Sequence, residues 1–244
     1  MDQVKNLADN RLVNGCLYCG GADESRDHVP SRVFLDSPLP ENLPIVSACS
    51  RCNNSFSLDE AYVACLIESV IAGSTDPARI RRPGIASLLQ RRPALRARIE
   101  SAKSFSDGQI QFNIEPDRIR NVILKLARGH AAFELSQVRR DEPKSFWWYP
   151  LPLMTDAQRD DFDASHVVQM IGEVGSRGSQ RLLATQITLQ SLNDGGQSTL
   201  NLVINDWLDV QEGCYRYLAI DDVGEIKIKI VIAEYLACEV TWPV

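Results

Sequence analysis

The sequence predicts an α+β protein with an N-terminal zinc-stapled module, a helical segment and a β-rich C-terminal region. Three observations lead to this fold class. Two CxxC pairs lie near the start of the chain, apolar residues recur at helical spacing in its middle, and apolar and polar residues alternate in its last hundred residues. With 244 residues, 44% of them apolar, the chain can bury a sizeable core in one large domain or two modest ones.

Four of the seven cysteines form the two pairs, Cys16 with Cys19 and Cys49 with Cys52, with 29 residues between the pairs. A CxxC pair can place both sulfurs on one metal ion, and two pairs complete the tetrahedral sulfur shell that zinc favours. Two disulfides are the weaker alternative, because nothing in the chain indicates an oxidising compartment. The spacing therefore predicts a structural Zn²⁺ on these four cysteines.

Asp27 and His28 lie between the two pairs, and zinc alone does not require them. A site with four cysteine ligands is closed, so His28 is free for other work. A neutral imidazole accepts a proton from water near neutral pH. Asp27 offers the hard oxygen ligands that Mg²⁺ prefers. The two residues together are therefore suited to acid–base chemistry beside a metal ion.

At these positions the chain resembles the HNH endonucleases, which have a ββα-metal, treble-clef fold. The resemblance runs from Cys16 to roughly Glu60, about a fifth of the chain. It includes the first cysteine pair, the DHVP stretch at 27–30, Asn42 in ENL, and the second cysteine pair with Asn53 directly after it. Four separate elements thus occur in the order that the family shows.

The resemblance implies a role for each matching residue. His28 would be the general base that activates water, and Asp27 and Asn53 would hold a catalytic Mg²⁺ or Mn²⁺. Asn42 would brace the loop or orient His28. Asn53 stands where many members have histidine, which disfavours softer transition metals. The implied activity is metal-dependent hydrolysis of phosphodiester bonds, with DNA as the expected substrate and RNA as the alternative.

Turn and capping signals predict the first elements. Residues 3–10 are expected to form a short helix, and a proline-rich loop is expected to join two strands, one at Asp27 and His28 and one near LPIVSA. A helix begins at the second cysteine pair. A capping box of Ser57 and Glu60 then predicts a buried helix over 58–72, which Gly73 ends. We expect a nuclease module over 1–73 and a C-terminal region over 74–244.

Residues 79–140 carry 14 Lys and Arg against 5 Asp and Glu, whereas residues 1–78 carry 5 against 11. The net charge of −6 argues against a nucleic-acid partner, but phosphate contacts depend on local patches. Two helices are expected in this basic window, one over 86–102 interrupted at Pro93 and one over 116–137. The window predicts a DNA-binding surface, with a solvated amphipathic face as the alternative. Its expected phosphate contacts are Arg91, Arg92, Arg96 and Arg98.

After the aromatic and proline-rich segment FWWYPLPLM, the chain is expected to be β-rich. Alternation appears in TLNLVIN, CYRYLAI and EIKIKIVIAEYLACEVTW, with IDDVGE as a turn. Lys227 and Lys229 lie between isoleucines, as on a sheet with one face in water. This region shows no recognisable chemistry, so we expect it to serve substrate binding, homodimer or partner-protein contacts, or regulation.

No run approaches the roughly 18 apolar residues of a membrane span, and no secretory signal is evident. The expected compartment is therefore the cytoplasm, with no membrane partner. Two alternatives to the nuclease stay open: a non-catalytic zinc module that binds nucleic acid or protein, and a nuclease effector regulated by a sensor or a partner protein. A treble clef has no structural use for Asp27, His28 and Asn53 together, which favours the nuclease. His130 and His166 have no partner motif beside them.

Overall fold

The computed structural model describes residues 15–106, 109–172, 174–190 and 196–244. The short helix expected over 3–10 lies outside these residues. The described chain is mixed α/β, with four separate antiparallel sheets. None of the helices in these ranges combines the length and the apolar character that a membrane crossing needs.

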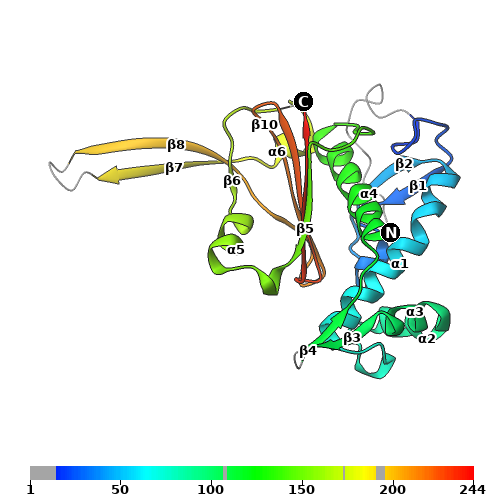
Figure 1. The fold of residues 1–244 in the computed structure, drawn as a ribbon. Helices are drawn as coiled ribbons and strands as arrows, with labels where there is room; N and C mark the ends of the chain where they lie inside the picture. The colour runs from blue at the N-terminus through cyan, green and yellow to red at the C-terminus, as the bar shows by residue number, and fades with distance from the viewer. Residues whose placement is uncertain (1–14, 107–108, 173, 191–195) are drawn as a thin grey trace.

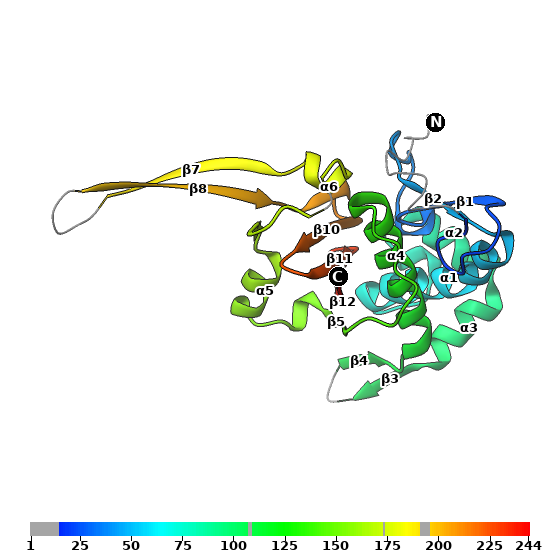
Figure 2. The ribbon, with the colours of Figure 1, turned by 90° about the horizontal axis from the view of Figure 1, so that it is seen from above.

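The elements are stacked in layers. In Figure 1 a five-stranded sheet stands in the middle, and helix α4 (Pro116–Leu135) covers one of its faces. Helix α1 (Ser50–Ala72) and the N-terminal hairpin lie beyond α4, on the side away from the sheet. Figure 2 shows the same order from above, with α5 (Asp156–Asp163) on the other face of the sheet. Helix α4 therefore separates the N-terminal hairpin from the C-terminal sheet.

The hairpin pairs β1 (Ser25–His28) with β2 (Ile45–Ala48) in antiparallel register, so that Asp27 faces Val46 and His28 faces Ile45. The loop between the strands holds one 3₁₀ turn, η1 (Arg32–Phe34). Helix α1 starts two residues after β2. The expected order of two strands followed by a helix at the second cysteine pair is confirmed.

The capping box expected at Ser57 and Glu60 is wrong. Helix α1 is one continuous element of 23 residues from Ser50 to Ala72, and Cys49 is its N-cap. Backbone N–H groups are free only in the first turn of a helix, so none near residue 57 needs a cap. The Ser57 hydroxyl instead donates to the carbonyl of Asn54. Gly73 ends the helix as expected, in the left-handed conformation with φ of 60°.

The basic window folds into three helices and a small hairpin. Its first helical stretch is interrupted at Pro93, as expected, because proline lacks the N–H that would continue the helix. Before it lies the 3₁₀ turn η2 (Pro77–Arg79). The sequence did not predict the hairpin between the helices. The elements after η2 are α2 (Pro83–Arg91), α3 (Pro93–Ser101), β3 (Lys103–Ser106), β4 (Gln109–Phe112) and α4.

The five-stranded sheet is antiparallel throughout, in the order β5–β12–β11–β10–β9. Isoleucines 226, 228 and 230 of β11 are fully buried, and Lys227 and Lys229 face the opposite side, as the alternation predicted. Val223 and Gly224 form the tight β10–β11 turn with φ of 47° and 74°, which confirms the turn expected at IDDVGE. The strands are β5 (Ser145–Pro150), β9 (Leu208–Gln211), β10 (Tyr215–Asp222), β11 (Glu225–Ile232) and β12 (Leu236–Pro243).

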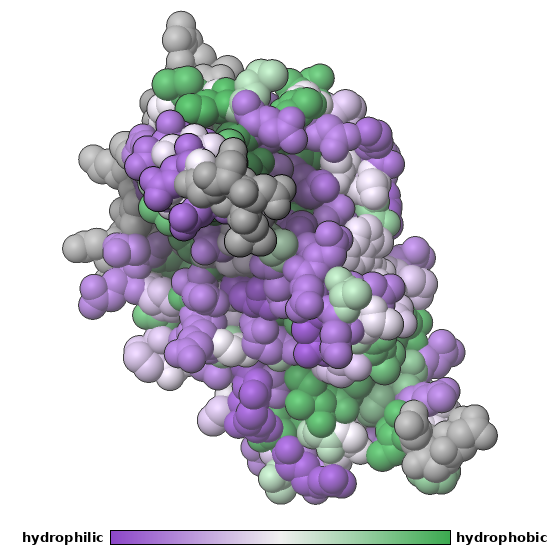
Figure 3. Space-filling model, turned by 90° about the vertical axis from the view of Figure 1, so that its left-hand side faces the viewer, coloured by the Kyte–Doolittle hydropathy of each residue, from purple (hydrophilic) through white to green (hydrophobic). Residues whose placement is uncertain are grey.

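A two-stranded ribbon projects from the body of the molecule (Figures 1 and 2). It pairs β7 (Leu183–Gln190) with β8 (Gln197–Asn205), and β6 (His166–Val167) joins it at its base. Two short helical segments lie near the sheet, η3 (Leu151–Leu153) and α6 (Arg177–Gln180). An apolar groove lies between α1, α4, the β3–β4 hairpin and the edge of the five-stranded sheet at β5 and η3. Figure 3 shows apolar side chains low on the face that carries the ribbon.

One hydrophobic core runs through both halves of the chain. Tyr62 of α1, Ile123 of α4 and Trp242 of β12 belong to the same cluster of buried side chains. The domain boundary expected near residue 73 coincides with the end of α1, but not with a gap in this core. The hairpin is therefore held by residues from well beyond position 73.

Gly129 marks the closest approach of α4 to the hairpin. A Cβ atom there would lie 2.6 Å from Cγ2 of Val29, which follows β1 directly. We expect Gly129→Ala to lower the free energy of unfolding by about 1–3 kcal/mol, because the clash outweighs the better helix propensity of alanine. Gly84 of α2 is the matched control, since a Cβ there meets nothing within 4 Å. Gly84→Ala should be neutral or stabilising by up to about 1 kcal/mol in the same denaturant titration, and a stabilised Gly129→Ala protein would contradict the packing.

Candidate functional site

The four cysteines of the two CxxC pairs come together. Their Sγ atoms all lie within 4.8 Å of one another, and the Sγ atoms of Cys19 and Cys49 are 3.7 Å apart. Zinc–sulfur bonds of about 2.3 Å in a tetrahedron place sulfurs about 3.8 Å apart, so the donor set fits a zinc ion. Cys16 and Cys19 lie in the turn before β1, and Cys49 and Cys52 lie at the start of α1. The cluster could therefore hold a structural metal ion such as zinc.

The turn that carries Cys16 and Cys19, the first knuckle, is shaped by glycines and held by an arginine from far along the chain. Gly15 and Gly20 have φ of 82° and 76°, a region that favours glycine. A Cβ on Gly15 would also meet the carbonyl oxygen of Gly21 at 2.8 Å. Arg140 donates from Nε to the carbonyl of Leu17 and from Nη2 to that of Cys16, both at 3.1 Å. The segment after α4 thus braces the turn that carries the first two sulfurs.

The thiols of the cluster differ in pKa. Burial raises the pKa of Cys16, but hydrogen bonds from the backbone near Cys49, Cys19 and Tyr18 outweigh it and bring the pKa to about 7. Burial and hydrogen bonds with the neighbouring sulfurs raise the pKa of Cys52 far above its usual value. Four thiolates this close would repel one another without a cation. Metal binding and deprotonation of the four sulfurs are therefore coupled.

Asp27 is buried and faces inward. Its Oδ2 accepts a hydrogen bond of 2.7 Å from the Tyr18 hydroxyl, and its Oδ1 accepts one of 2.9 Å from Nζ of Lys125. Burial, followed by the charge of Asp27, raises the pKa of Tyr18 well above its usual value, so its hydroxyl remains a donor. Tyr18 stands between the two cysteines of the first knuckle. The zinc-type cluster and the Asp27 carboxylate are thus joined through one side chain.

Lys125 of α4 also belongs to this junction, although no sequence motif indicated it. Its ammonium also donates to Oε1 of Glu60 at 2.6 Å and to the Ser31 hydroxyl at 2.5 Å. The side chain is 1% exposed. Lys125 and Asp27 are 98 residues apart in sequence, which no local motif spans. The available signal was a charged residue within the apolar run VILKLA of a helix.

His28 differs from Asp27 in side-chain direction, burial and hydrogen bonding. Alternation along β1 turns its side chain away from that of Asp27, and it is half-buried. Among the described residues no group forms a hydrogen bond with its imidazole. Burial, and then the charge of Arg32, lower its pKa below 6.5, although Asp27 opposes this shift. The imidazole is therefore neutral at pH 7, with both ring nitrogens available.

The two asparagines lie in different places. Asn53, in the first turn of α1, donates from Nδ2 to the Ser25 hydroxyl at 3.2 Å and to the carbonyl of Arg26 at 3.3 Å. It ties α1 to β1 next to Asp27. Asn42 is exposed in the turn before β2, where it lines a hollow of about 460 Å³ that Tyr217 of the C-terminal sheet also lines. The structure thus brings Asp27, His28 and Asn53 to one hairpin–helix junction, while Asn42 faces the C-terminal sheet.

Much of the positive charge in the basic window is paired within the chain. Arg82 is buried and donates to Asp36 at 2.8 Å, and Arg118 donates to Asp59 at 2.6 Å. Of the four arginines expected to bind phosphate, Arg98 forms two hydrogen bonds of 2.6 Å with Glu115. Within the described ranges Arg91, Arg92 and Arg96 form no ion pair. Arg91 and Arg92 are exposed at the junction of α2 and α3. The expected DNA-binding surface is therefore smaller than the basic window and centres on these two arginines.

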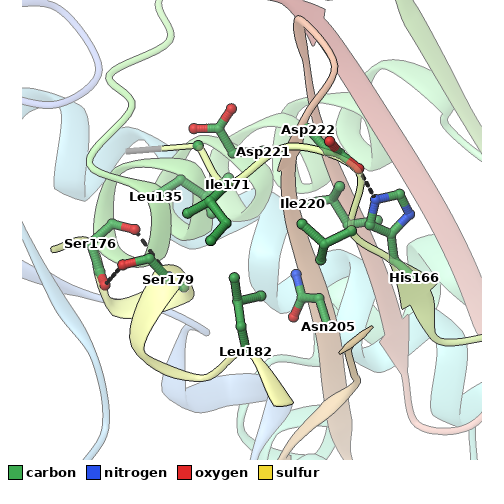
Figure 4. A pocket seen from close by; sticks show the side chains of 13 residues that line it. Leu135, His166, Ile171, Ser176, Ser179, Leu182, Asn205, Ile220, Asp221 and Asp222 are labelled. Atoms are coloured by element: carbon green, nitrogen blue, oxygen red, sulfur yellow. Dashed lines mark hydrogen bonds and ion pairs between the residues drawn. The ribbon is translucent and has the colours of Figure 1, made fainter. Parts of the chain in front are cut away.

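The other two histidines have structural surroundings. His130 is fully buried, with Nε2 at 2.8 Å from the Tyr215 hydroxyl, and burial lowers its pKa to about 3. His166 lies at 2.7 Å from Oδ2 of Asp222, beside a small hollow shown in Figure 4. The hollow measures about 20 Å³, which holds about one water molecule. Each of these two histidines thus has a hydrogen-bond partner within the described chain.

The described residues therefore place a four-cysteine cluster, which could hold a metal ion, beside a half-buried histidine without a hydrogen-bond partner and a buried carboxylate. No family model, no curated protein and no solved structure matches this chain. The geometry of this hairpin–helix junction is therefore the basis for assigning a function.

Proposed function

We propose that this protein is a nuclease of the HNH type, which hydrolyses phosphodiester bonds of DNA at the hairpin–helix junction. The observation that carries the proposal is His28, a half-buried and neutral imidazole without a hydrogen-bond partner in the described chain, next to a cysteine-stapled turn. A histidine in a purely structural role would ordinarily be bonded, as His130 and His166 are.

In the proposed reaction His28 takes a proton from a water molecule. The oxygen of that water attacks phosphorus, the bond from phosphorus to the leaving oxygen breaks, and the leaving oxygen acquires a proton. A general base of this kind contributes about 10²- to 10⁴-fold to the rate. The lowered pKa keeps His28 in its base form at neutral pH.

The resemblance also implies Mg²⁺ or Mn²⁺ on Asp27 and Asn53, and the residues as they lie do not fit it. Each oxygen of Asp27 accepts a hydrogen bond, one from Tyr18 and one from a buried ammonium. The side-chain amide nitrogen of Asn53 donates hydrogen bonds to β1, which leaves only its Oδ1 as a ligand atom. A divalent ion would have to displace or crowd Lys125, and the proposed proton transfer to His28 does not require one.

The pairing of Asp27 with Lys125 favours a second candidate function, a non-catalytic zinc module that binds nucleic acid or protein. A third hypothesis, a nuclease controlled by a sensor or a partner protein, involves the same chemistry as the proposed nuclease. Incubation of the purified protein with plasmid DNA, single-stranded DNA and RNA separates the first two. We expect nicked or linear plasmid, and the arms with Mg²⁺, Mn²⁺ or EDTA measure metal dependence. Uncleaved substrates in every arm, with nucleic acid bound, would favour the binder.

DNA binding should depend on Arg91 and Arg92, the exposed arginines between α2 and α3. Each phosphate contact adds about 0.9 to the slope of log K against log salt on B-DNA. Reversing both charges (Arg91→Glu with Arg92→Glu) should flatten the slope by up to about two units and weaken binding to all sequences alike. Arg98→Gln is the comparison, with a smaller expected effect because Glu115 already pairs that charge. If the slope of the double variant equals that of the wild type, these arginines lie on a solvated face or a protein interface.

A further inference from the structure

We propose that the ammonium of Lys125 occupies the position beside Asp27 and Glu60 that a metal cation would otherwise take. Lys125 and a divalent cation would then exclude each other at Asp27. This proposal deepens the proposed function. It rests on that function only for what the site is used for, and not for the contacts of Lys125. Nζ of Lys125 lies 2.9 Å from Asp27, 2.6 Å from Glu60 and 2.5 Å from Ser31, an oxygen atom in each case.

The geometry around Nζ is that of a bound cation. A lysine ammonium has three donors, and here each has one oxygen acceptor. Two of the acceptors are carboxylates from separate elements, Asp27 of β1 and Glu60 of α1. Such an arrangement of hard oxygen atoms is what a divalent cation would require. Mg²⁺ binds oxygen at about 2.0–2.1 Å, so the ion and the ammonium cannot share the same oxygen cage.

Burial makes this lysine necessary. The side chains of Lys125, Asp27 and Glu60 are 1%, 7% and 13% exposed. Two carboxylates this far from water, converging on one point, need a positive charge between them. The Tyr18 hydroxyl supplies only a neutral hydrogen bond to Asp27. Among the described residues Lys125 is the one cation that bonds to both carboxylates.

The charge comes from outside the hairpin. Lys125 lies on α4, one turn before Gly129, where an added Cβ would clash with Val29 directly after β1. Helix α4 therefore contributes both the packing surface and the counter-charge of the hairpin. The site is therefore complete only when α4 is docked against the hairpin.

The test is the binding of Mn²⁺ to the full-length, zinc-loaded protein in the absence of nucleic acid. Wild-type protein should show no Mn²⁺ site that depends on Asp27. Lys125→Met removes the ammonium at similar volume and should create one such site, seen as loss of the electron paramagnetic resonance signal of free Mn²⁺. Mn²⁺ at 100 times its Kd should also shift the folding equilibrium of this variant about 100-fold.

Three controls make the result decisive. Lys144→Met, at an exposed lysine paired with Glu225, should not change the Mn²⁺ response. Adding Asp27→Asn to Lys125→Met should abolish the new site. If Lys125→Met does not fold even with Mn²⁺, the neutral triple variant with Asp27→Asn and Glu60→Gln should fold, because no unpaired carboxylate remains.

An Asp27-dependent Mn²⁺ site in the wild-type protein would overturn the proposal. So would a folded Lys125→Met protein that gains no Mn²⁺ site, or a triple variant that stays unfolded. None of these outcomes involves cleavage, so a protein that fails as a nuclease can still confirm the role of Lys125, and an active nuclease can still refute it.

Discussion

Cys49→Ser should release the metal ion and unfold the N-terminal hairpin. Cys49 has three roles at once: its sulfur belongs to the four-cysteine cluster, it caps α1 by accepting from the backbone N–H of Cys52, and it joins β2 to α1. Structural zinc contributes about 10–16 kcal/mol of apparent binding energy in isolated zinc-finger peptides, and that energy is also folding energy. The loss here should be smaller, because α1 and α4 share a large core. Elemental analysis and a denaturant titration measure the two effects.

Cys214→Ser is the matched control for this experiment. Cys214 is also buried, but it lies away from the cluster, and its thiol donates to Asp36 at 3.5 Å, which a serine hydroxyl can imitate. The control should keep about one zinc per chain. Full zinc content in the Cys49→Ser protein would show that these sulfurs are not a metal site.

Local signals in the sequence were sufficient for the hairpin and the cysteine cluster. Each CxxC pair, the proline-rich loop and Gly73 act over a few residues, and each corresponds to the observed geometry. The capping box failed for a related reason. Ser57 and Glu60 have the right spacing, but α1 had already begun seven residues earlier, at Ser50. A local motif has no meaning of its own inside an element that neighbouring residues have already started.

Long-range pairing was beyond the reach of the sequence analysis. The excess of positive charge in residues 79–140 predicted a surface for phosphate, but Arg82, Arg118 and Lys125 turn inward to acidic partners from residues 1–78. The opposite charges of the two segments thus reflect in part how they fold together. The same limit hid the contact of Lys125 with Asp27, because the two side chains meet only when α4 is placed against β1.

His28→Ala should abolish cleavage while leaving the zinc content and nucleic-acid binding near those of the wild type. The side chain bonds to no described residue and is only half-buried, so its removal costs little in folding. A rate loss of about 10²- to 10⁴-fold is expected for a general base. The pH profile adds a second readout. The base must be neutral, and burial holds the pKa of His28 below 6.5, so the rate should rise with pH in the acidic range and be flat above about pH 7.

His166→Ala is the matched control, because His166 is also half-buried but bonds to Asp222 far from the hairpin. It should keep both the rate and the pH profile. Wild-type cleavage by the His28→Ala protein would exclude His28 as the base. If the His28→Ala protein instead unfolds, the histidine has a structural role, and the non-catalytic zinc module becomes the better account of the junction. A profile that keeps rising well above pH 7 would point to a base other than a histidine with a lowered pKa.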